Sequence, residues 1–180
     1  MSHHPSVPIR RSLTASIAAV LALGIAVPAA ANPTTATVLI TGGSLSISAP
    51  LAAGSLGTTA NTVLGTTISG QLGEVQVNDA RGAAAGSGWV ASVISTAFTP
   101  LAGPTIAASA VGYTANAIVK VGTATYTAND PANLTGASPA VTATGITGDN
   151  SATWNPTINV TVPGGMAAGV YSATITHSVL

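Results

Sequence analysis

The alternation of apolar and polar side chains near the end of the chain constrains the fold more than any other feature. From Tyr171 to Val179, odd positions carry tyrosine, alanine, isoleucine, histidine and valine, and even positions carry serine or threonine. Successive side chains of a β-strand point to opposite faces of the sheet, so a period of two indicates a strand with one face on the core. We therefore expect a half-buried strand over Val170–Val179, with His177 on its apolar face.

Similar alternation predicts strands elsewhere. The clearest are Leu45–Ser48, Thr62–Ser69, Glu74–Asp79, Gly88–Ser95 and Thr157–Val162, and weaker patterns mark Asn116–Gly122 and Ala140–Gly145. Clusters of Gly, Pro, Asn and Asp separate these segments and favour turns. The alanine-rich piece Ala102–Ala110 contains Pro104 and no charged residue to solvate an outer face, so we expect one short turn there and no long helix.

Two connections are predicted to be hairpins. The stretch Asp79–Gly88 is long enough to join the strand of Val75 and Val77 to one that begins at Trp89, and the turn sequence after Thr157–Val162 leads into the final strand. Short strands separated by turns predict one all-β domain over Asn32–Leu180, a single antiparallel β-sandwich or a barrel-like domain.

The N-terminus has the order of a secretory signal peptide. Arg10 and Arg11 precede an apolar run over Leu13–Val27, which Pro28 ends, and Ala29–Ala31 supplies small residues. This order predicts cleavage after Ala31, with residues 1–31 as the signal peptide. The alternative is an uncleaved membrane anchor, but the run is short for a span of about 20 residues. We expect a secreted or cell-surface protein, with no membrane span in the mature chain.

The composition limits which kinds of partner we expect. The chain has no cysteine, so an exported domain of this kind depends on its core and its hydrogen bonds for stability. After residue 31, the basic side chains are Arg81 and Lys120, against four acidic ones. This balance lacks the basic footprint of a nucleic-acid-binding protein, so we expect no nucleic acid partner.

The residue inventory disfavours catalysis, and no cofactor is expected. His177 is the one histidine after residue 4, and no nucleophile-elbow pattern occurs. Glu74 and Asp79 lie five apart on a predicted strand and point to opposite faces, so they cannot flank one bond. Turn chemistry explains Asp130 and Asp149, and although calcium at these loops is conceivable, no dense acidic loop occurs.

The stretch Leu72–Val90 holds a disproportionate share of the charge. Asp79 and Arg81 lie two positions apart, and we expect them to form a solvated pair or to cap the backbone at the start of the predicted loop. Most of the six aromatic residues after residue 31 are expected in the core, Trp89 above all. Trp154, flanked by turn residues, is the best candidate for an exposed surface platform, although a structural role is favoured for it too.

The same residues resemble a known family. The segment "LGEVQVNDARGAAAGSGWVASVISTAF" (Leu72–Phe98) resembles the signature region of WxL-domain surface proteins of Gram-positive bacteria, and "GVYSATITHSVL" resembles their closing strand. In this chain the first motif has Ala91 in place of leucine, and the second has His177 in place of tryptophan and Val179 in place of leucine. The matching positions, which we expect to be structural, are Asp79, Arg81, Gly82, Gly88, Trp89 and Tyr171.

The resemblance implies non-covalent attachment to the cell wall. The leading expectation is thus an exported, non-enzymatic surface protein whose partner is a cell-wall polymer or another surface protein. A second hypothesis is a pilus-like or matrix-forming subunit that assembles through strand edges, for which Asn32–Ile40 would serve as an extension. A third hypothesis is a hydrolase, which the scarcity of candidate catalytic residues disfavours.

Overall fold

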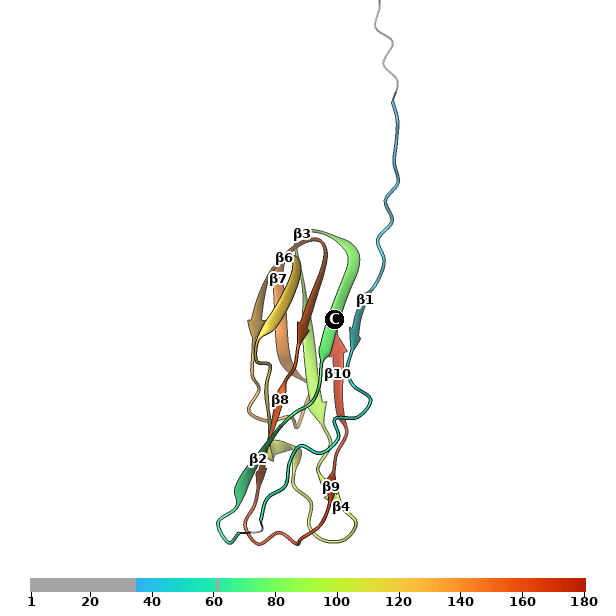
Figure 1. Ribbon diagram of the computed structural model, residues 1–180. Coiled ribbons are helices and arrows are strands. Elements are labelled where there is room, and N and C mark those ends of the chain that lie inside the picture. The colour runs from blue at the N-terminus through green and yellow to red at the C-terminus, as the bar shows by residue number, and fades with distance from the viewer. Residues whose placement is uncertain (1–34, 61) are drawn as a thin grey trace, which may run out of the picture. The chain divides into compact units, whose positions relative to one another are not determined.

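The structure is a computed structural model that describes residues 35–60 and 62–180 (Figure 1). The fold lies in the unit Leu39–Leu180. Within the described residues it is almost entirely antiparallel β-structure, which confirms the predicted class, and its single helical element is the three-residue 3₁₀ turn η1 (Ala108–Ala110). The predicted signal peptide lies outside the described residues.

Three long strands form the centre of the fold. β3 (Val75–Ser95) pairs with β7 (Ser138–Trp154) along its whole length, and β6 (Ile118–Ala128) pairs with the other edge of β7. Both pairings are antiparallel, and the three strands belong to one five-stranded sheet.

This sheet folds back on itself. Along β7, Ala143 pairs with Trp89 and Asn150 with Asp79, so a straight strand would hold these two rungs about 23 Å apart. Yet the indole Nε1 of Trp89 lies 3.1 Å from Oδ1 of Asn150. The two halves of each long strand therefore face one another as the layers of a β-sandwich-like fold, and Figure 1 shows the strands curving over near the label of β3.

Register shifts in the pairing mark the bend. Apart from one shift between Ala91 and Ser92, they fall between Asp79 and Trp89 on β3 and between Val121 and Thr125 on β6. Gly122 has a φ of 86°, and a Cβ there would lie 2.5 Å from the carbonyl oxygen of Asp149. A side chain would clash in this left-handed conformation, so glycine is required where β6 turns from one layer to the other.

Two short strands complete the sheet on the free edge of β3. β1 (Leu45–Ser48) pairs with Gln76–Asp79, and β10 (Ile175–Val179) pairs with Ala91–Ser95, so each serves one layer. The opposite edge is β6, and none of the backbone hydrogen bonds in the described part of the chain reaches its outer side.

Beyond the end of the folded sheet, a three-stranded sheet continues one of its layers. β2 (Thr66–Gln71) and β5 (Val111–Thr114) flank β8 (Thr157–Val162), which follows β7 after Asn155 and Pro156. The amide of Leu72 donates to the carbonyl of Pro156, and Asn155 Oδ1 accepts from the amide of Gly73. These contacts tie the two sheets together where Pro156 interrupts the ladder.

A further pair, β4 (Thr99–Pro100) and β9 (Tyr171–Ser172), lies with long loops at the same end, below β2 in Figure 1. The core between the layers is built from valine, alanine and a few large side chains. Its largest fully buried members include Trp154, Tyr113, Leu134, Ile146 and Ile158. Within the described residues, no helix is long and apolar enough to cross a membrane.

Most predicted strands are present, but both predicted hairpins are wrong. Leu45–Ser48 and Thr157–Val162 match β1 and β8 residue for residue. Glu74–Asp79 and Gly88–Ser95 are instead two halves of β3, and both pair with β7. The final strand pairs with β3, whereas β8 pairs with β2 and β5. A turn sequence specifies a local reversal, but it does not choose the neighbour of the strand that follows.

Candidate functional site

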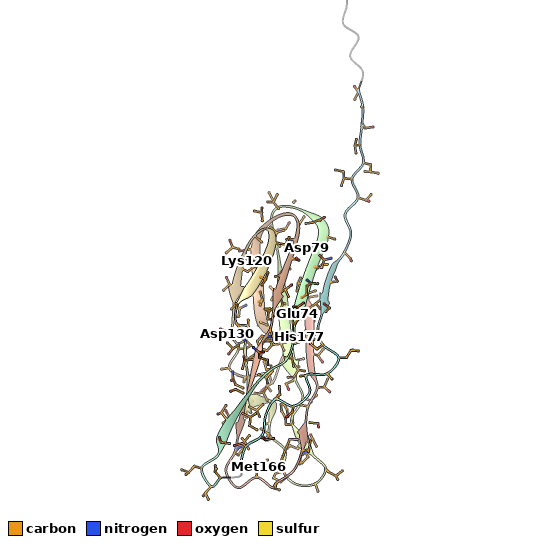
Figure 2. The ribbon with its side chains drawn as sticks, viewed as in Figure 1. Glu74, Asp79, Lys120, Asp130, Met166 and His177 are labelled. Atoms are coloured by element: carbon orange, nitrogen blue, oxygen red, sulfur yellow. The ribbon has the colours of Figure 1, made fainter. Side chains whose placement is uncertain are left out.

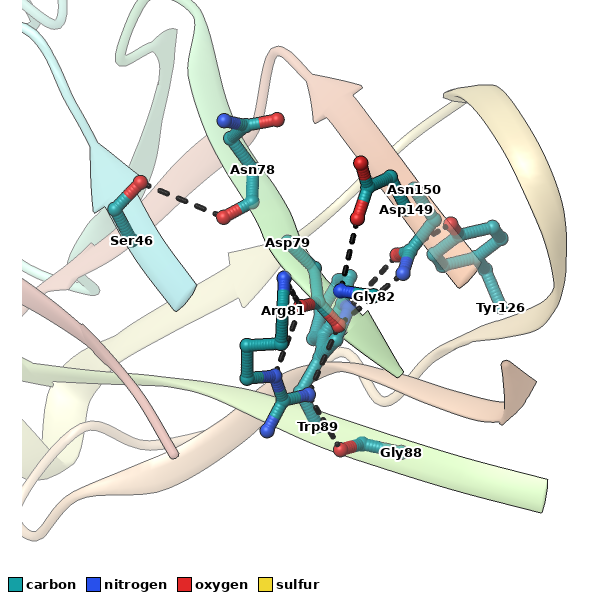
Figure 3. Close-up of polar contacts among 10 residues, drawn as sticks. All are labelled: Ser46, Asn78, Asp79, Arg81, Gly82, Gly88, Trp89, Tyr126, Asp149 and Asn150. Carbon is teal, nitrogen blue, oxygen red and sulfur yellow. Dashed lines mark hydrogen bonds and ion pairs between the residues drawn. The ribbon is translucent and has the colours of Figure 1, made fainter. Parts of the chain in front are cut away.

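Five of the six matching residues of the family resemblance, Asp79, Arg81, Gly82, Gly88 and Trp89, lie at the bend. Asp79 is fully buried, at 0% exposed, and Arg81 holds it with two parallel bonds, Nε to Oδ1 at 2.8 Å and Nη2 to Oδ2 at 2.9 Å. The amide of Arg81 adds a bond to Oδ1, and its Nη2 also donates to the carbonyl of Gly88 (Figure 3). Arg81 thus links the two halves of β3 across its irregular middle.

Asn150 connects this pair to the opposite layer. Its Oδ1 accepts bonds from Trp89 Nε1 and from the Tyr126 hydroxyl, both at 3.1 Å, and its Nδ2 donates to Asp79 Oδ2 at 3.1 Å. The rings of Trp89 and Tyr126 pack at 5.6 Å between centroids. Figure 3 shows these side chains converging from different strands. We call Asp79, Arg81, Trp89, Tyr126 and Asn150 the bend cluster.

The electrostatics of the bend cluster follow from this bonding. The side-chain bonds from Arg81 lower the pKa of Asp79 below its ordinary value, against the opposing effect of burial. The bond to Asp79 raises the pKa of Arg81. Burial raises the pKa of the Tyr126 hydroxyl, and the charge of Asp79 adds to this effect. Asp79 is therefore ionised and Tyr126 is a neutral donor at neutral pH.

The glycines of the motif have steric roles. Gly82 has a φ of 61° and donates its amide to Asp149 Oδ1 at 2.9 Å. A Cβ on Gly88 would lie 2.7 Å from the carbonyl oxygen of Ala143. Gly82 supplies the left-handed backbone conformation, and Gly88 allows the close approach to β7, where β3 is bulged.

The structure corrects the interpretation of Asp79 as a solvated hairpin residue. The pair with Arg81 is present, as predicted, but the carboxylate lies inside the sandwich and Arg81 is 36% exposed. The period of two places Asp79 on the same face as Val75 and Val77, which are also fully buried. The buried side chains of Asp79, Trp89, Tyr126 and Asn150 are bonded to one another and tie the two layers together, while Arg81 keeps part of its guanidinium exposed.

A second polar chain crosses the interior nearer to the other end. Trp154 Nε1 donates to the Tyr113 hydroxyl at 2.7 Å, and this hydroxyl lies 3.2 Å from His177 Nε2. Trp154 is 2% exposed, so the candidate surface platform is wrong: the alternation of β7 turns its indole inward with Ala152 and Asn150. Burial lowers the pKa of His177 to about 4, and its Nδ1 is buried without a partner among the described residues.

The acidic residues outside the bend cluster do not form a chemical site. Glu74 is exposed, Asp130 caps the amide of Ala115 at 2.8 Å, and Asp149 caps Gly82. Neither is the local turn contact that was expected, because the bonded residues are 15 and 67 positions away in the sequence and Asp149 lies within β7. In residues 35–60 and 62–180, no three His, Cys, Asp or Glu side chains are placed to share a metal ion.

An open cavity of about 840 Å³ lies at the end opposite the bend. Its floor consists of core side chains, Leu72, Phe98, Ile106, Val160 and Met166. Segments 50–60 and 166–175 wall it, and β2 borders it with Thr66 and Ile68. Tyr171, the last motif residue, lines the cavity and donates its hydroxyl to the carbonyl of Ala167 at 2.9 Å. Figure 2 shows Met166 at this end and Asp79 towards the other.

The rim of the cavity is an exposed apolar surface. Its segments 49–60, 62–65, 101–105 and 163–170 contain no Asp, Glu, Lys or Arg. Gly165 donates its amide to the carbonyl of Thr62, and a Cβ on Gly103 would lie 3.7 Å from Cβ of Ala167, so the segments are neighbours. We call them the loop end. The large apolar side chains most exposed on it are Leu51, Val63, Leu64, Leu101 and Val170.

Sequence reasoning missed Asn150, Tyr126 and Tyr113 as polar partners of the two tryptophans. The sequence held one signal for Asn150. It lies two and four positions before Ala152 and Trp154, so in a strand its amide is on the same, otherwise apolar, face. Comparisons with family models, with curated proteins and with solved structures returned no match.

Proposed function

We propose that this chain is an exported, non-enzymatic surface domain that associates non-covalently with the cell wall or with a surface partner through its loop end. The observation that carries the proposal is the loop end itself. Leu51 and Leu101 are fully exposed there, among segments without a single charge. Contiguous apolar surface of this kind marks interaction sites in soluble domains, because it gains free energy when another surface covers it.

The resemblance to WxL-domain surface proteins supports the cellular setting. Its motif residues Asp79, Arg81 and Trp89 lie in the bend cluster, so they account for the fold, while contact with a partner falls to other residues. Tyr171 alone of the motif residues borders the cavity.

The chemistry of the loop end favours a surface protein over a carbohydrate polymer. Carbohydrate sites use exposed aromatic faces, but Trp89, Trp154, Phe98, Tyr113 and Tyr126 are buried, and Tyr171, which lines the cavity, is half-buried. Aliphatic side chains suit the apolar core of a protein interface.

Sedimentation with isolated cell walls tests the proposal. Walls that retain their proteins and walls stripped of protein are each mixed with purified Asn32–Leu180, and bound protein is measured by titration. We expect retention that Leu101→Asp weakens at least tenfold on the protein-retaining walls. Val119→Asp, on β6, is the matched control and keeps parental binding, since Val119 is also exposed but lies outside the loop end. Absence of binding to both preparations, or equal losses in both variants, contradicts the proposal.

A subunit that assembles through its own surfaces is a second candidate. Two observations favour it: β6 is an edge strand of 11 residues with an open outer side, and Val38, Leu39 and Ile40 are 86%, 88% and 87% exposed. Open strand edges and exposed apolar segments are the elements by which β-proteins join.

A further inference from the structure

We propose that the cavity at the loop end receives the N-terminal segment of a second copy of this chain, with Leu39 and Ile40 among its apolar lining. This inference develops the second candidate function, a subunit that assembles through its own surfaces, by naming the partner as another copy of the chain. It rests on the proposed function only for the extracellular location. The segment Thr35–Gly42 is the donor segment, and it has no strand pairing in its own chain.

The donor segment carries apolar side chains that its own fold leaves uncovered. Val38, Leu39 and Ile40 are consecutive, and each exposes more than four-fifths of its surface. A strand would turn Leu39 to one face and Val38 and Ile40 to the other. Burying an exposed leucine or isoleucine contributes about 1.5–3 kcal/mol, which gives this segment a strong tendency to associate.

The cavity has the complementary properties. It is lined mainly by apolar residues, and its size lies in the range of about 300–1,000 Å³ of sites that enclose organic ligands. No charged residue lies in its lining or in the donor segment, so their association carries no free-energy cost for burying an unpaired charge. β2, which borders the cavity, is the edge strand of its sheet and leaves main-chain groups for an added strand.

Leu39 and Ile40 cannot reach the cavity of their own chain. Gly43 donates its amide to Ala80 near the bend, and the paired strand from Gly43 to Ser48 spans about 17 Å before the cavity begins at Pro50. Leu39 lies four residues from Gly43, a reach of about 14 Å even when fully extended. The occupant must therefore come from another molecule.

The donor segment enters the domain at the end opposite the cavity. It joins β1 near the bend, where Gly43 donates its amide to Ala80, whereas the segments that wall the cavity are loops at the end beyond β2. Such an interface is heterologous, because each copy offers one surface and uses a different one. Repetition of this contact yields head-to-tail chains that lengthen with protein concentration.

Cysteine cross-linking tests the contact directly, since the chain has no cysteine of its own. Purified Asn32–Leu180 carrying Leu39→Cys is mixed with the same protein carrying Ala168→Cys, an exposed position on the cavity wall. The control partner carries Ala128→Cys, an equally exposed alanine on β6. We expect a mixed disulfide dimer at least tenfold more abundant with Ala168→Cys than with Ala128→Cys.

Light scattering at rising concentration provides the second readout. The parent should grow in mass, and Leu39→Asp should stay monomeric with an unchanged melting temperature, because this side chain makes no contact in its own fold. Val119→Asp should assemble like the parent. Equal cross-linking to both partners, a monomeric parent, or assembly lost in Val119→Asp and kept in Leu39→Asp overturns the proposal. No wall material is present, so these results are independent of the sedimentation test.

Discussion

Trp89 donates its indole hydrogen to the side-chain oxygen of Asn150, 3.1 Å away, from the opposite layer of the sandwich. These residues stand 61 positions apart, and neither is a cross-strand neighbour of the other. Their hydrogen bond shows that the long strands fold back, because only a bent sheet brings Trp89 and Asn150 within bonding distance. Asn150 also holds Asp79 and Tyr126, so the bend depends on polar contacts as well as on glycine.

Replacing Asp79 by alanine should destabilise the domain by about 1.5–3 kcal/mol, because a buried carboxylate with charge-assisted bonds is lost and Asn150 Nδ2 is left without its acceptor. Urea unfolding of Asp79→Ala measures this change. Glu74→Ala is the matched control and should unfold like the parent, since Glu74 is exposed on the same segment. Equal free energies of unfolding for the two variants would contradict this and indicate that Asp79 behaves as a surface residue.

Replacing Gly122 by alanine should cost about 1–3 kcal/mol, because the position combines a φ of 86° with close approach of the Asp149 carbonyl. The control is Gly136→Ala, where an added Cβ meets nothing within 4 Å. The difference between their melting temperatures checks the prediction, and a Gly122→Ala protein that melts with its control would show that the bend does not need this glycine.

His177 should make stability depend on pH in a defined window. Burial lowers its folded pKa to about 4, and the unfolded value is about 6.5, so the unfolded chain binds more protons between these limits. Stability then falls as pH decreases from about 6.5 to 4, by up to about 1.4 kcal/mol per pH unit. The lowered pKa of Asp79 acts below this window, since its contribution is lost only as the pH falls below about 4.

The assignment to His177 is checked with His177→Gln in the chain that begins at Asn32, which then contains no histidine. Urea unfolding of parent and variant at intervals from pH 7 to pH 4.5 should show a slope in the parent that the variant lacks. The same slope in both proteins would place the titrating group elsewhere.

Export should produce a chain that begins at Asn32, because Ala29–Ala31 follows an apolar run that Pro28 ends. Intact mass of the protein from the culture medium or cell surface measures this. A mass that retains residues 1–31 would support the anchor, and a start inside the domain would mean a different maturation.

The strands could be predicted from the sequence, but their partners could not. Alternation in Leu45–Ser48 and Thr157–Val162 is a local property, and it survived into the structure unchanged. The course of β3 depends on β7, nearly sixty residues later, which pairs with both of its halves and lets the chain pass through Gly82 and Gly88 without reversing. Loop chemistry at "DARGAAAGSG" therefore indicated a hairpin where the structure has a bulged bend.

The site shows the same limit. The burial of Trp89 follows from its apolar neighbours, and it was predicted. Trp154 lies among turn residues in the sequence, but in the structure its indole donates to Tyr113 of β5, and Tyr113 in turn contacts His177 of β10. The cavity arises from segments 50–60 and 166–175, and no pattern within either segment encodes their meeting.

The central claim is that the bend cluster stabilises the fold and that the loop end contacts the partner. Variants of Trp89 test this claim most directly. Thermal unfolding and sedimentation with protein-retaining walls are measured on the same samples of Trp89→Phe and Trp89→Ala. Trp89→Ala should lose about 3–5 kcal/mol, and Trp89→Phe should lose less because it keeps most of the packing. We predict that the folded fraction of either variant binds walls like the parent, since Trp89 is buried at the bend, away from the loop end. A Trp89→Phe protein that melts like the parent and no longer binds walls would contradict this and make Trp89 a ligand contact.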